Sequence, residues 1–453
     1  MRFQNFVRGE MQDSAEGVDL QVTDYSGKGV VATVPDSGRT ELVEARIFAY
    51  NEGHKVDLLP LEDRIGLVHE MISRTLSDSR LLENVALVHG TPVNYLSGTA
   101  DSLRTWADDL GRFVENVDRF SVERDGVHLS ERSLVSPYFI VAAGNDEVYE
   151  TPFIVGQSIL GGAHAIIRPS ANDIAAHILF EKIAEMGLPY LAQKLSWSSL
   201  SKPEMVQEAL AFSKGFSIFS SNAAYERIVR TVVGDRVIKD LSIGRSSRRY
   251  GSGHSIAIVG NGADIDQAAD ELVYASARNK GNKCWAVTAV YVHEDVYDEF
   301  VDALENRAKG LKHGSPTNPK TDLPRFHESA LRGILDSGLS PRFGRIFPDK
   351  NDIDLMIYEL PSSKVLEAQE VSLPVIALLP YSTYIGAVKQ IRDSMHVRGT
   401  DKLLSLGVFG TGELADYLSS RIPHDTLKLN MSLGVDVFKP HQGSYFLLDV
   451  MRK

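Results

Sequence analysis

The segment Tyr138-Phe-Ile-Val-Ala142 is a short apolar run of β-branched and aromatic residues, which is typical of a strand buried on both faces. Ala165-Ile-Ile-Arg168 is a second such run, and Pro169 ends it. We expect Asn172 or Asp173 to cap the helix that follows. Strands that alternate with helices at this spacing predict a parallel sheet with helices on both faces.

The same alternation occurs again in the second half of the chain. Ser255-Ile-Ala-Ile-Val259 predicts a strand, residues 264–279 a helix, and Ala286 to Val292 another strand. Leu403 to Phe409 and Gly412 to Ser420 predict a further strand and helix. We therefore expect a second α/β domain.

The remaining segments are predicted to be helices and short strands. Apolar residues at helical spacing predict a helix over residues 60–77, and further helices are expected near 101–117. Residues 120–134 alternate around Asp125-Gly126, which predicts a β-hairpin that could pair across a subunit boundary. The alternating stretch from Thr426 suggests strands that close the structure.

The composition is that of an acidic soluble protein. The chain has 453 residues, enough for two or three domains of roughly 150 residues each. With 60 acidic against 48 basic residues the formal net charge is -12, so nucleic acid and anionic membrane surfaces are not expected as partners. Apolar stretches such as Val375 to Leu379 are too short to span a bilayer, and Met1 to Gly17 does not resemble a secretory signal. We expect a cytoplasmic protein.

The single cysteine, Cys284, excludes an intramolecular disulfide and a cysteine-cluster metal site, and no metal is expected. It lies in Asn279-Lys-Gly-Asn-Lys-Cys-Trp-Ala286, between a predicted helix and a predicted strand. This segment resembles the nucleophile motif of the aldehyde dehydrogenase superfamily, Asn-x-Gly-Gln-x-Cys, with Asn282 in place of the glutamine. Without such a context, a lone cysteine is more often a small buried apolar residue than a nucleophile.

Six further segments resemble motifs of the same superfamily in the same order: Phe6 to Glu10, Pro60 to Leu76, Ala143-Gly-Asn145, Ile166 to Ser170, Gly314 to Asp322 and Glu370 to Val375. Each match is weak alone, but together they extend over nearly the whole chain. The resemblance implies an α/β fold with two Rossmann-like domains, a cysteine at their cleft and a small β oligomerisation element.

Domain boundaries follow from the same resemblance. The implied NAD(P)-binding domain comprises residues 1–117 and 138–247, and the catalytic domain comprises residues 248–428. Residues 118–137 and 429–453 would form the β oligomerisation element. The resemblance therefore also implies a homodimer or homotetramer.

The resemblance assigns the reacting groups. Cys284 would attack a carbonyl carbon as a thiolate, and the side-chain amide of Asn145 would donate to the oxyanion that forms. Without the family match, Asn145 reads more simply as a turn-forming residue after a strand.

The resemblance also implies a nicotinamide cofactor. Arg168 stands where the family has a lysine that contacts the adenosine ribose, and Ser170 belongs to the same segment. Ala171 replaces the glutamate of many NAD-preferring members, which favours NADP(H) over NAD(H), since a carboxylate there would repel a 2′-phosphate. Glu370 matches the glutamate that binds the nicotinamide-side ribose, and Ser221-Asn222 occupies the phosphate-side loop, where a serine replaces the usual glycine. Alternatively, Arg168 and Glu370 are solvated surface charges.

The position of the general base is where this sequence departs from hydrolytic members. Their Glu-Leu-Gly-Gly-Lys is replaced by Tyr250-Gly-Ser-Gly-His254, which puts Tyr250 at the glutamate position, and no carboxylate lies between Leu241 and Gly262. A tyrosine with an ordinary pKa of about 10 is a poor base at neutral pH, so hydrolysis of an acyl enzyme is expected to be slow. His254 could move a proton or contact a phosphate, or be an inert turn residue.

This pattern resembles acylating aldehyde dehydrogenases and acyl-CoA reductases. The expected reaction interconverts a small-molecule aldehyde and a thioester of coenzyme A or of an acyl carrier, and Arg245, Arg248 and Arg249 could hold coenzyme A phosphates. Two other reactions stay open: oxidation of an aldehyde to a carboxylic acid and reduction of an acyl phosphate. A non-catalytic scaffold is disfavoured, because it would need neither Cys284 nor Asn145.

Overall fold

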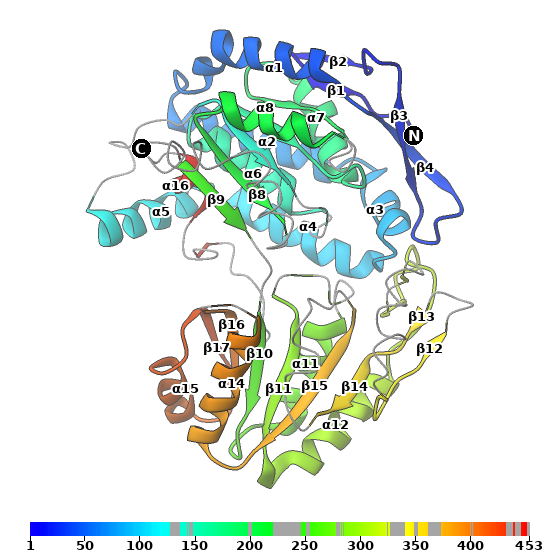
Figure 1. Ribbon diagram of the computed structural model, residues 1–453, viewed down its shortest axis with the longest axis vertical. Helices are drawn as coiled ribbons and strands as arrows, with labels where there is room; N and C mark the ends of the chain where they lie inside the picture. The colour runs from blue at the N-terminus through cyan, green and yellow to red at the C-terminus, as the bar shows by residue number, and fades with distance from the viewer. Residues whose placement is uncertain are drawn as a thin grey trace.

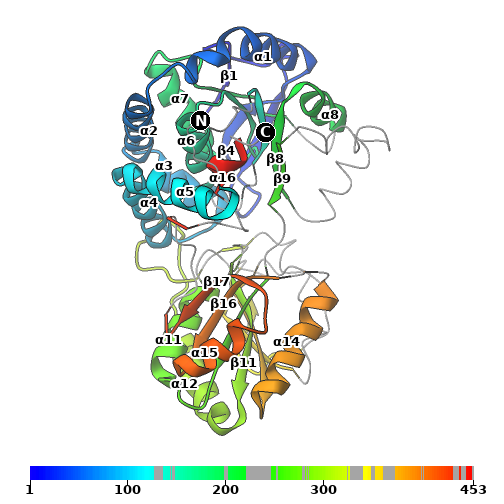
Figure 2. The same ribbon diagram turned by 90° about the vertical axis from the view of Figure 1, so that its left-hand side faces the viewer.

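The chain folds into two α/β domains, each built around its own sheet (Figures 1 and 2). The computed structural model describes residues 1–126, 136–142, 144, 148–197, 202–220, 246–250, 254–277, 281, 283, 285–323, 325–326, 340–347, 352–360, 373–398, 400, 402–431, 438–439 and 445–450. In both views the first domain, which holds the N-terminus, lies above the second.

The sheet of the first domain has seven strands in the order β2-β1-β7-β6-β5-β8-β9. Their bounds are β1 Asn5–Val7, β2 Glu10–Gln12, β5 Tyr138–Val141, β6 Ala165–Arg168, β7 Ala192–Lys194, β8 Gly215–Phe219 and β9 Ser246–Tyr250. The strands β5 to β9 are parallel, whereas β1 runs antiparallel to both β2 and β7. The predicted parallel sheet and its two central strands, β5 and β6, are confirmed.

Helices cover both faces of this sheet, which explains why its central strands are apolar throughout. Phe139 and Val141 of β5 pack with α1 (Arg39–Glu52) and α8 (Pro203–Phe212). The alternate residues of β5, Tyr138 and Ile140, belong to the core on the other face. That core is formed with α2 Leu61–Leu76, α4 Val93–Asp108, α5 Leu110–Asp125, α6 Glu150–Leu160, α7 Ile174–Glu185 and α16 Phe446–Val450.

A smaller layer completes the first domain. It consists of the antiparallel pair β3 Asp19–Thr23 and β4 Val30–Pro35 and the helix α3 Leu81–His89. The short 3-10 helix η1 Gly53–Val56 directly follows α1 and contributes Val56 to the main core. The helix expected over 60–77 is α2, and those expected near 101–117 are parts of α4 and α5.

The sheet of the second domain has six parallel strands in the order β14-β15-β11-β10-β16-β17. Their bounds are β10 Ser255–Val259, β11 Val287–His293, β14 Met356–Glu359, β15 Val375–Tyr381, β16 Leu403–Phe409 and β17 His424–Leu429. One face packs against α11 (Ile265–Ala277) and α12 (Tyr297–Lys309), and the other against α14 (Tyr384–Arg398) and α15 (Gly412–Ser419). The second predicted α/β domain is therefore confirmed.

Three short elements complete the description of the second domain. The 3-10 helix η4 (Glu294–Val296) joins β11 to α12, and β12 (Ile346–Phe347) pairs antiparallel with β13 (Asp352–Ile353). No helix in the described ranges is long and apolar enough to cross a membrane.

The expected hairpin over residues 120–134 is wrong in its first half. Residues 120–125 are the last turns of α5, and Gly126, with a φ of 67°, caps that helix in the left-handed conformation. An Asp-Gly pair suits a hairpin turn and a helix end equally well, because both place glycine at positive φ. Residues 118–125 therefore do not supply strands to an oligomerisation element, and residues 127–135 lie outside the described ranges.

The strands expected from Thr426 onward are confirmed only as far as Leu429, the end of β17. β17 already belongs to the second sheet, and residues 446–450 form the helix α16, which lies beside α6 and β9 of the first domain (Figure 1). The backbone N–H of Leu447 donates to Oε1 of Gln157 at 2.8 Å in a buried hydrogen bond. The expected boundary at residue 248 is likewise displaced, because β9 pairs with β8 and so belongs to the first domain up to Tyr250.

Candidate functional site

The strands β5, β6, β8 and β9 end at nearly the same register position of the first sheet. Most of the predicted cofactor-binding segments come directly after these strand ends. Arg168, the last residue of β6, pairs with Val141 of β5. Val141 pairs in turn with Ile218 of β8, and Ile218 with Arg249 of β9. In the order β7-β6-β5-β8-β9 the sequence of strands reverses direction between β5 and β8. Ligands of doubly wound sheets bind outside the carboxyl ends of the strands at such a point.

The Arg168 side chain is held at this edge by Trp197. Its Nη2 donates to the carbonyl oxygen of Trp197 at 2.9 Å, and its guanidinium carbon lies 5.9 Å from the centroid of the indole ring. Burial lowers the pKa of Arg168 to about 10. In the part of the chain that the structure describes, no carboxylate pairs with this guanidinium, so its charge is available to an anionic group.

The turn after Arg168 is fixed by the start of α7. Asp173 caps the helix, as one of the two predicted capping residues, and its Oδ1 accepts from the backbone N–H of Ala176 at 2.9 Å. The hydroxyl of Thr151, from α6, donates to Oδ2 of Asp173 at 2.6 Å. The turn that carries Ser170 and Ala171 is therefore anchored at both ends, by Arg168 and by Asp173.

Gly144 places the segment that follows β5 against this turn. A Cβ atom added at Gly144 would lie 2.9 Å from Cβ and 3.0 Å from Oγ of Ser170. The backbone just before Asn145 therefore approaches Ser170 closely. Asn145 itself lies outside the described residues.

The ends of β8 and β9 bring two more predicted segments to the same edge. Phe219 pairs with Tyr250 in the last register position of the two strands, and Ser220 follows directly. Ser221 and Asn222 lie outside the described residues. Tyr250, which we expect at the position of the family's catalytic glutamate, is thus the last residue of β9.

The segment before Cys284 approaches the segment after Glu370. Gly281 has a φ of 65°, and a Cβ atom added there would lie 2.2 Å from the carbonyl oxygen of Leu373. These segments lead into β11 and β15, which are parallel neighbours. Cys284 and Glu370 both lie outside the described residues, so they stay predictions.

The two sheet edges face the same domain boundary. Tyr250 ends β9 of the first sheet and Ser255 begins β10 of the second, so the two residues are at most about 18 Å apart along the chain. The domains also touch directly, since the backbone N–H of Arg325 donates to the carbonyl of Gly90 at 2.9 Å. The carboxyl edge of the first sheet is therefore close to the amino edge of the second (Figure 1).

His254 is not brought to these edges as an exposed group. Its side chain is 2% exposed, and Nε2 lies 3.4 Å from Oγ of Ser394 on α14. Its carbonyl accepts from the backbone N–H of Leu404 at 2.9 Å. A ring enclosed between β10, α14 and β16 is poorly placed to bind a phosphate. Of the three arginines expected to hold coenzyme A, Arg248 and Arg249 lie on β9 and Arg245 lies outside the described residues.

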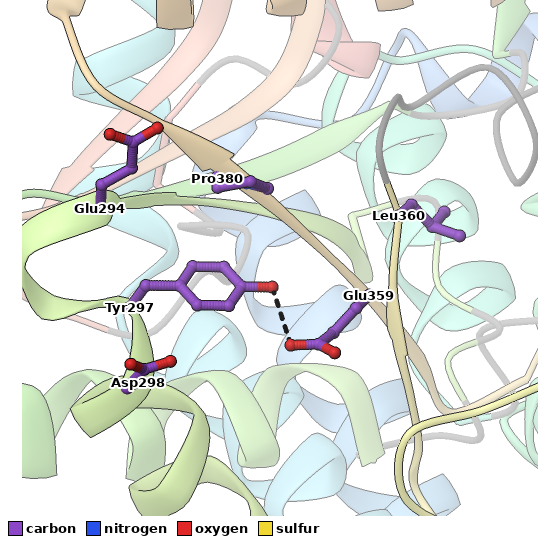
Figure 3. Close-up of a pocket in the computed structure, with 6 residues that line it drawn as sticks. All are labelled: Glu294, Tyr297, Asp298, Glu359, Leu360 and Pro380. Carbon is purple, nitrogen blue, oxygen red and sulfur yellow. Dashed lines mark hydrogen bonds between the residues drawn. The ribbon is translucent and has the colours of Figure 1, made fainter.

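A cavity of about 440 Å³ lies at the opposite edge of the second sheet (Figure 3). It is lined by Glu294, Tyr297, Asp298, Glu359, Leu360 and Pro380. The hydroxyl of Tyr297 donates to Oε1 of Glu359 at 3.3 Å, and burial, with this carboxylate beside it, raises the pKa of Tyr297. None of the predicted site residues lines this cavity, and it lies beyond the carboxyl ends of β11 and β14, whereas the cysteine segment enters β11 at its amino end.

Comparison with known proteins identifies the family. The family model described as "Aldehyde dehydrogenase family" matches residues 12–337. The chain belongs to the aldehyde dehydrogenase family. The resemblance inferred from the seven sequence motifs is therefore confirmed.

Relatives of this aldehyde dehydrogenase family member are distant but extend over most of it. The D-glyceraldehyde dehydrogenase (NADP(+)) of Picrophilus torridus is 24% identical over 421 residues, which are 86% of this chain and 82% of that protein. The lactaldehyde dehydrogenase of Escherichia coli is 22% identical over 83% of this chain and 80% of that protein. A solved E. coli NADP dependent enzyme superposes with a TM-score of 0.83 at 15% identity, over 99% of this chain and 96% of that chain. The expected α/β fold with two Rossmann-like domains is therefore confirmed.

Proposed function

We propose that this aldehyde dehydrogenase family member is an NADP(H)-dependent oxidoreductase that interconverts an aldehyde and an acyl thioester through Cys284. The observation that carries the proposal is Tyr250. It ends β9 at the position of the family's catalytic glutamate, and no carboxylate lies in the sequence from Leu241 to Gly262. A thioacyl enzyme without a general base is released faster by a thiol than by water, because a thiolate needs no such help.

The residues of the chain divide the chemistry as follows. The thiolate of Cys284 attacks the thioester carbonyl and forms a C–S bond, the C–S bond to coenzyme A or the carrier breaks, and that group leaves as its thiolate. The Asn145 amide donates to the oxyanion in both tetrahedral species. After reduction of the thioacyl carbon, the C–S bond to Cys284 breaks. The aldehyde is released, and Cys284 becomes a thiolate again. NADP(H), when bound, supplies or accepts the hydride.

The described residues fit NADP(H). The guanidinium of Arg168 has no carboxylate partner among them and lies at the carboxyl edge where nucleotides bind in such sheets. Ala171 places no negative charge beside a 2′-phosphate. The names of two similar proteins, the P. torridus dehydrogenase and the E. coli enzyme, both include NADP. Arg168, Ser170, Ser221, Asn222 and Glu370 would hold the cofactor.

The test measures NADPH and NADH oxidation with a panel of acyl-CoA thioesters, alongside the Cys284→Ala variant. Aldehyde formation that needs both the thioester and Cys284 is the expected result. The reverse reaction, aldehyde with NADP+, should be accelerated by free coenzyme A and give an acyl-CoA product. NADP+ reduction that yields a carboxylic acid at the same rate with and without coenzyme A would overturn the thioester assignment.

A second candidate is oxidation of an aldehyde to a carboxylic acid, with another group assisting water. The relatives favour it, since those reported above are named as dehydrogenases of D-glyceraldehyde and of lactaldehyde. The experiment separates the two candidates by the identity of the oxidised product.

A further inference from the structure

A lysine is buried beneath the turn that carries Ser170. Lys194, the last residue of β7, is 0% exposed, and its Nζ lies 2.9 Å from Nδ1 of His177. His177, in the first turns of α7, is also 0% exposed, and its ring stacks on Phe3 with centroids 4.9 Å apart. Neither residue belongs to a predicted motif.

Lys194 donates a hydrogen bond to His177, and His177 in turn donates one to the backbone of Ala171. Nε2 of His177 lies 3.3 Å from the carbonyl oxygen of Ala171, which can only accept, so Nε2 carries the hydrogen. A neutral imidazole protonated at Nε2 accepts at Nδ1, so Lys194 is the donor to it. A continuous chain therefore leads from the Lys194 ammonium through His177 to the backbone of Ala171.

Ala171 is the residue whose backbone this chain holds, and it lies between two assigned positions. Ser170 precedes it in the candidate cofactor turn, and Asp173, two residues later, caps α7. Ser170 and Ala171 are partly exposed, while His177 beneath them is buried. The pair thus supports an accessible turn from inside the domain.

We propose that Lys194 and His177 are positioning residues for the NADP(H)-binding turn, and that the charge on Lys194 determines how firmly the Ala171 carbonyl is held. This proposal rests on the proposed function, because it takes Arg168, Ser170 and Ala171 as the cofactor turn. An ammonium group can only donate to His177, which keeps the imidazole hydrogen on Nε2. A neutral amine can also accept a hydrogen bond, which permits the His177 tautomer that carries its hydrogen on Nδ1. In that tautomer the lone pair of Nε2 points towards the Ala171 carbonyl oxygen, and the hydrogen bond between them is lost.

The surroundings place this change of charge near neutral pH. Burial lowers the pKa of Lys194 to about 7, although the nearby carboxylates of Glu181 and Asp173 oppose this effect. Glu181 is itself paired with Arg80 at 2.6 Å. Burial and the nearby Lys194 hold the pKa of His177 well below its usual value, so that this ring stays neutral.

The test measures the dissociation constant of NADPH by fluorescence titration between pH 6 and pH 9, in the full chain and in two variants. Lys194→Gln can accept from His177 at every pH, as the neutral amine can, whereas Lys194→Met offers no acceptor, so the imidazole hydrogen keeps the Ala171 carbonyl as its partner. The 2′-phosphate also titrates near pH 6, so each wild-type value is divided by the Lys194→Met value at the same pH.

We expect this ratio to rise about threefold to tenfold from pH 6 to pH 9, which corresponds to the weakening of one hydrogen bond. Lys194→Gln should bind NADPH as weakly at pH 6 as the wild type does at pH 9, relative to Lys194→Met. A constant ratio, or wild-type affinity in Lys194→Gln at pH 6, would overturn the proposal. A purely structural role would lower the unfolding temperature of Lys194→Gln without producing this pH profile.

Two controls separate the possible failures. His89 contacts the same turn, with Nε2 at 3.0 Å from the carbonyl oxygen of Asn172, so His89→Gln should leave the pH dependence of the ratio unchanged. In ¹⁵N-histidine-labelled protein, the His177 signal, assigned with His177→Gln, should show hydrogen on Nε2 at pH 6. If NADPH binds neither the wild type nor any variant, the proposed NADP(H) dependence is wrong. If NADPH binds but the tautomer at pH 6 is the other one, only the positioning proposal falls.

Discussion

The α-carbon of Gly281 faces the carbonyl oxygen of Leu373 so closely that a Cβ atom would lie 2.2 Å from that oxygen. Gly281 also has a φ of 65°, which side chains other than glycine rarely adopt. Two segments that are 92 residues apart in sequence, before Cys284 and after Glu370, are therefore packed backbone against backbone. The described residues next to the proposed nucleophile Cys284 and the proposed ribose-binding Glu370 therefore share one backbone contact.

The first prediction tests this contact. Gly281→Ala should lower the free energy of unfolding by about 2 kcal/mol, because it adds a strained φ and a clash with Leu373. It should also reduce kcat, since the segment that leads to Cys284 must move. Gly66 is a matched control: it lies exposed within α2 with no atom within 4 Å of an added Cβ. Gly66→Ala should raise stability by about 0.5–1 kcal/mol. Unchanged stability in Gly281→Ala, measured by urea unfolding, would contradict the close approach.

The second prediction concerns the missing base. Tyr250→Glu restores a carboxylate at the end of β9, so NADP+-dependent formation of a carboxylic acid from an aldehyde should increase by about tenfold to a hundredfold. Tyr250→Phe serves as the control, because it alters the same position without adding a base. Product analysis by mass spectrometry distinguishes the acid from the thioester. The interpretation of Tyr250 fails if its glutamate variant forms no more acid than its phenylalanine variant.

The third prediction concerns cofactor preference. Arg168→Gln should raise the KM for NADPH about tenfold to a hundredfold and leave the KM for NADH nearly unchanged, because only NADPH carries a 2′-phosphate. Arg168→Lys keeps the charge and should show a smaller change. Steady-state kinetics with both cofactors provides the measurement. Equal effects on NADPH and NADH would indicate that Arg168 supports the strand end through Trp197 and does not read the phosphate.

The fourth prediction follows from the buried charge of Lys194. Its pKa is about 7 in the folded protein and close to 10.4 in an unfolded chain, so the unfolded chain binds one more proton between these values. The free energy of unfolding should therefore increase as the pH rises from about 7 to about 10. From pH 7 to pH 9 the wild type should gain about 2 kcal/mol more than Lys194→Met, as measured by urea unfolding. An identical pH dependence in both proteins would show that Lys194 is not titrating there.

Short apolar runs in the sequence predicted the strands that are buried on both faces of their sheets. β5, β6, β10 and β11 were recognisable because a strand covered on both sides has no polar residues to interrupt it. The Asp173 cap was recognisable because capping is a contact within one turn. Gly126 was misassigned, since a hairpin and a helix end make the same demand on that residue.

Other features depend on contacts between distant parts of the chain. α16 has only five residues, too few for apolar spacing to distinguish a helix from a strand, and its place in the first domain depends on packing near Gln157. The Lys194–His177 contact joins residues 17 positions apart on different elements, and no motif marks either. The same holds for Arg168, whose partner Trp197 lies 29 residues away.

The sequence by itself determined the family and the two parallel α/β units, because apolar strands separated by helices can pair in parallel only through such crossovers. It also predicted Cys284 and Asn145 as site residues through collinear motifs, and Tyr250 through a departure from the family's pattern. Only the tertiary structure showed which strands end at the same register position, that β9 belongs to the first domain, and that the backbone at Leu373 lies against Gly281. These are matters of register and packing between elements, which no short stretch of sequence records.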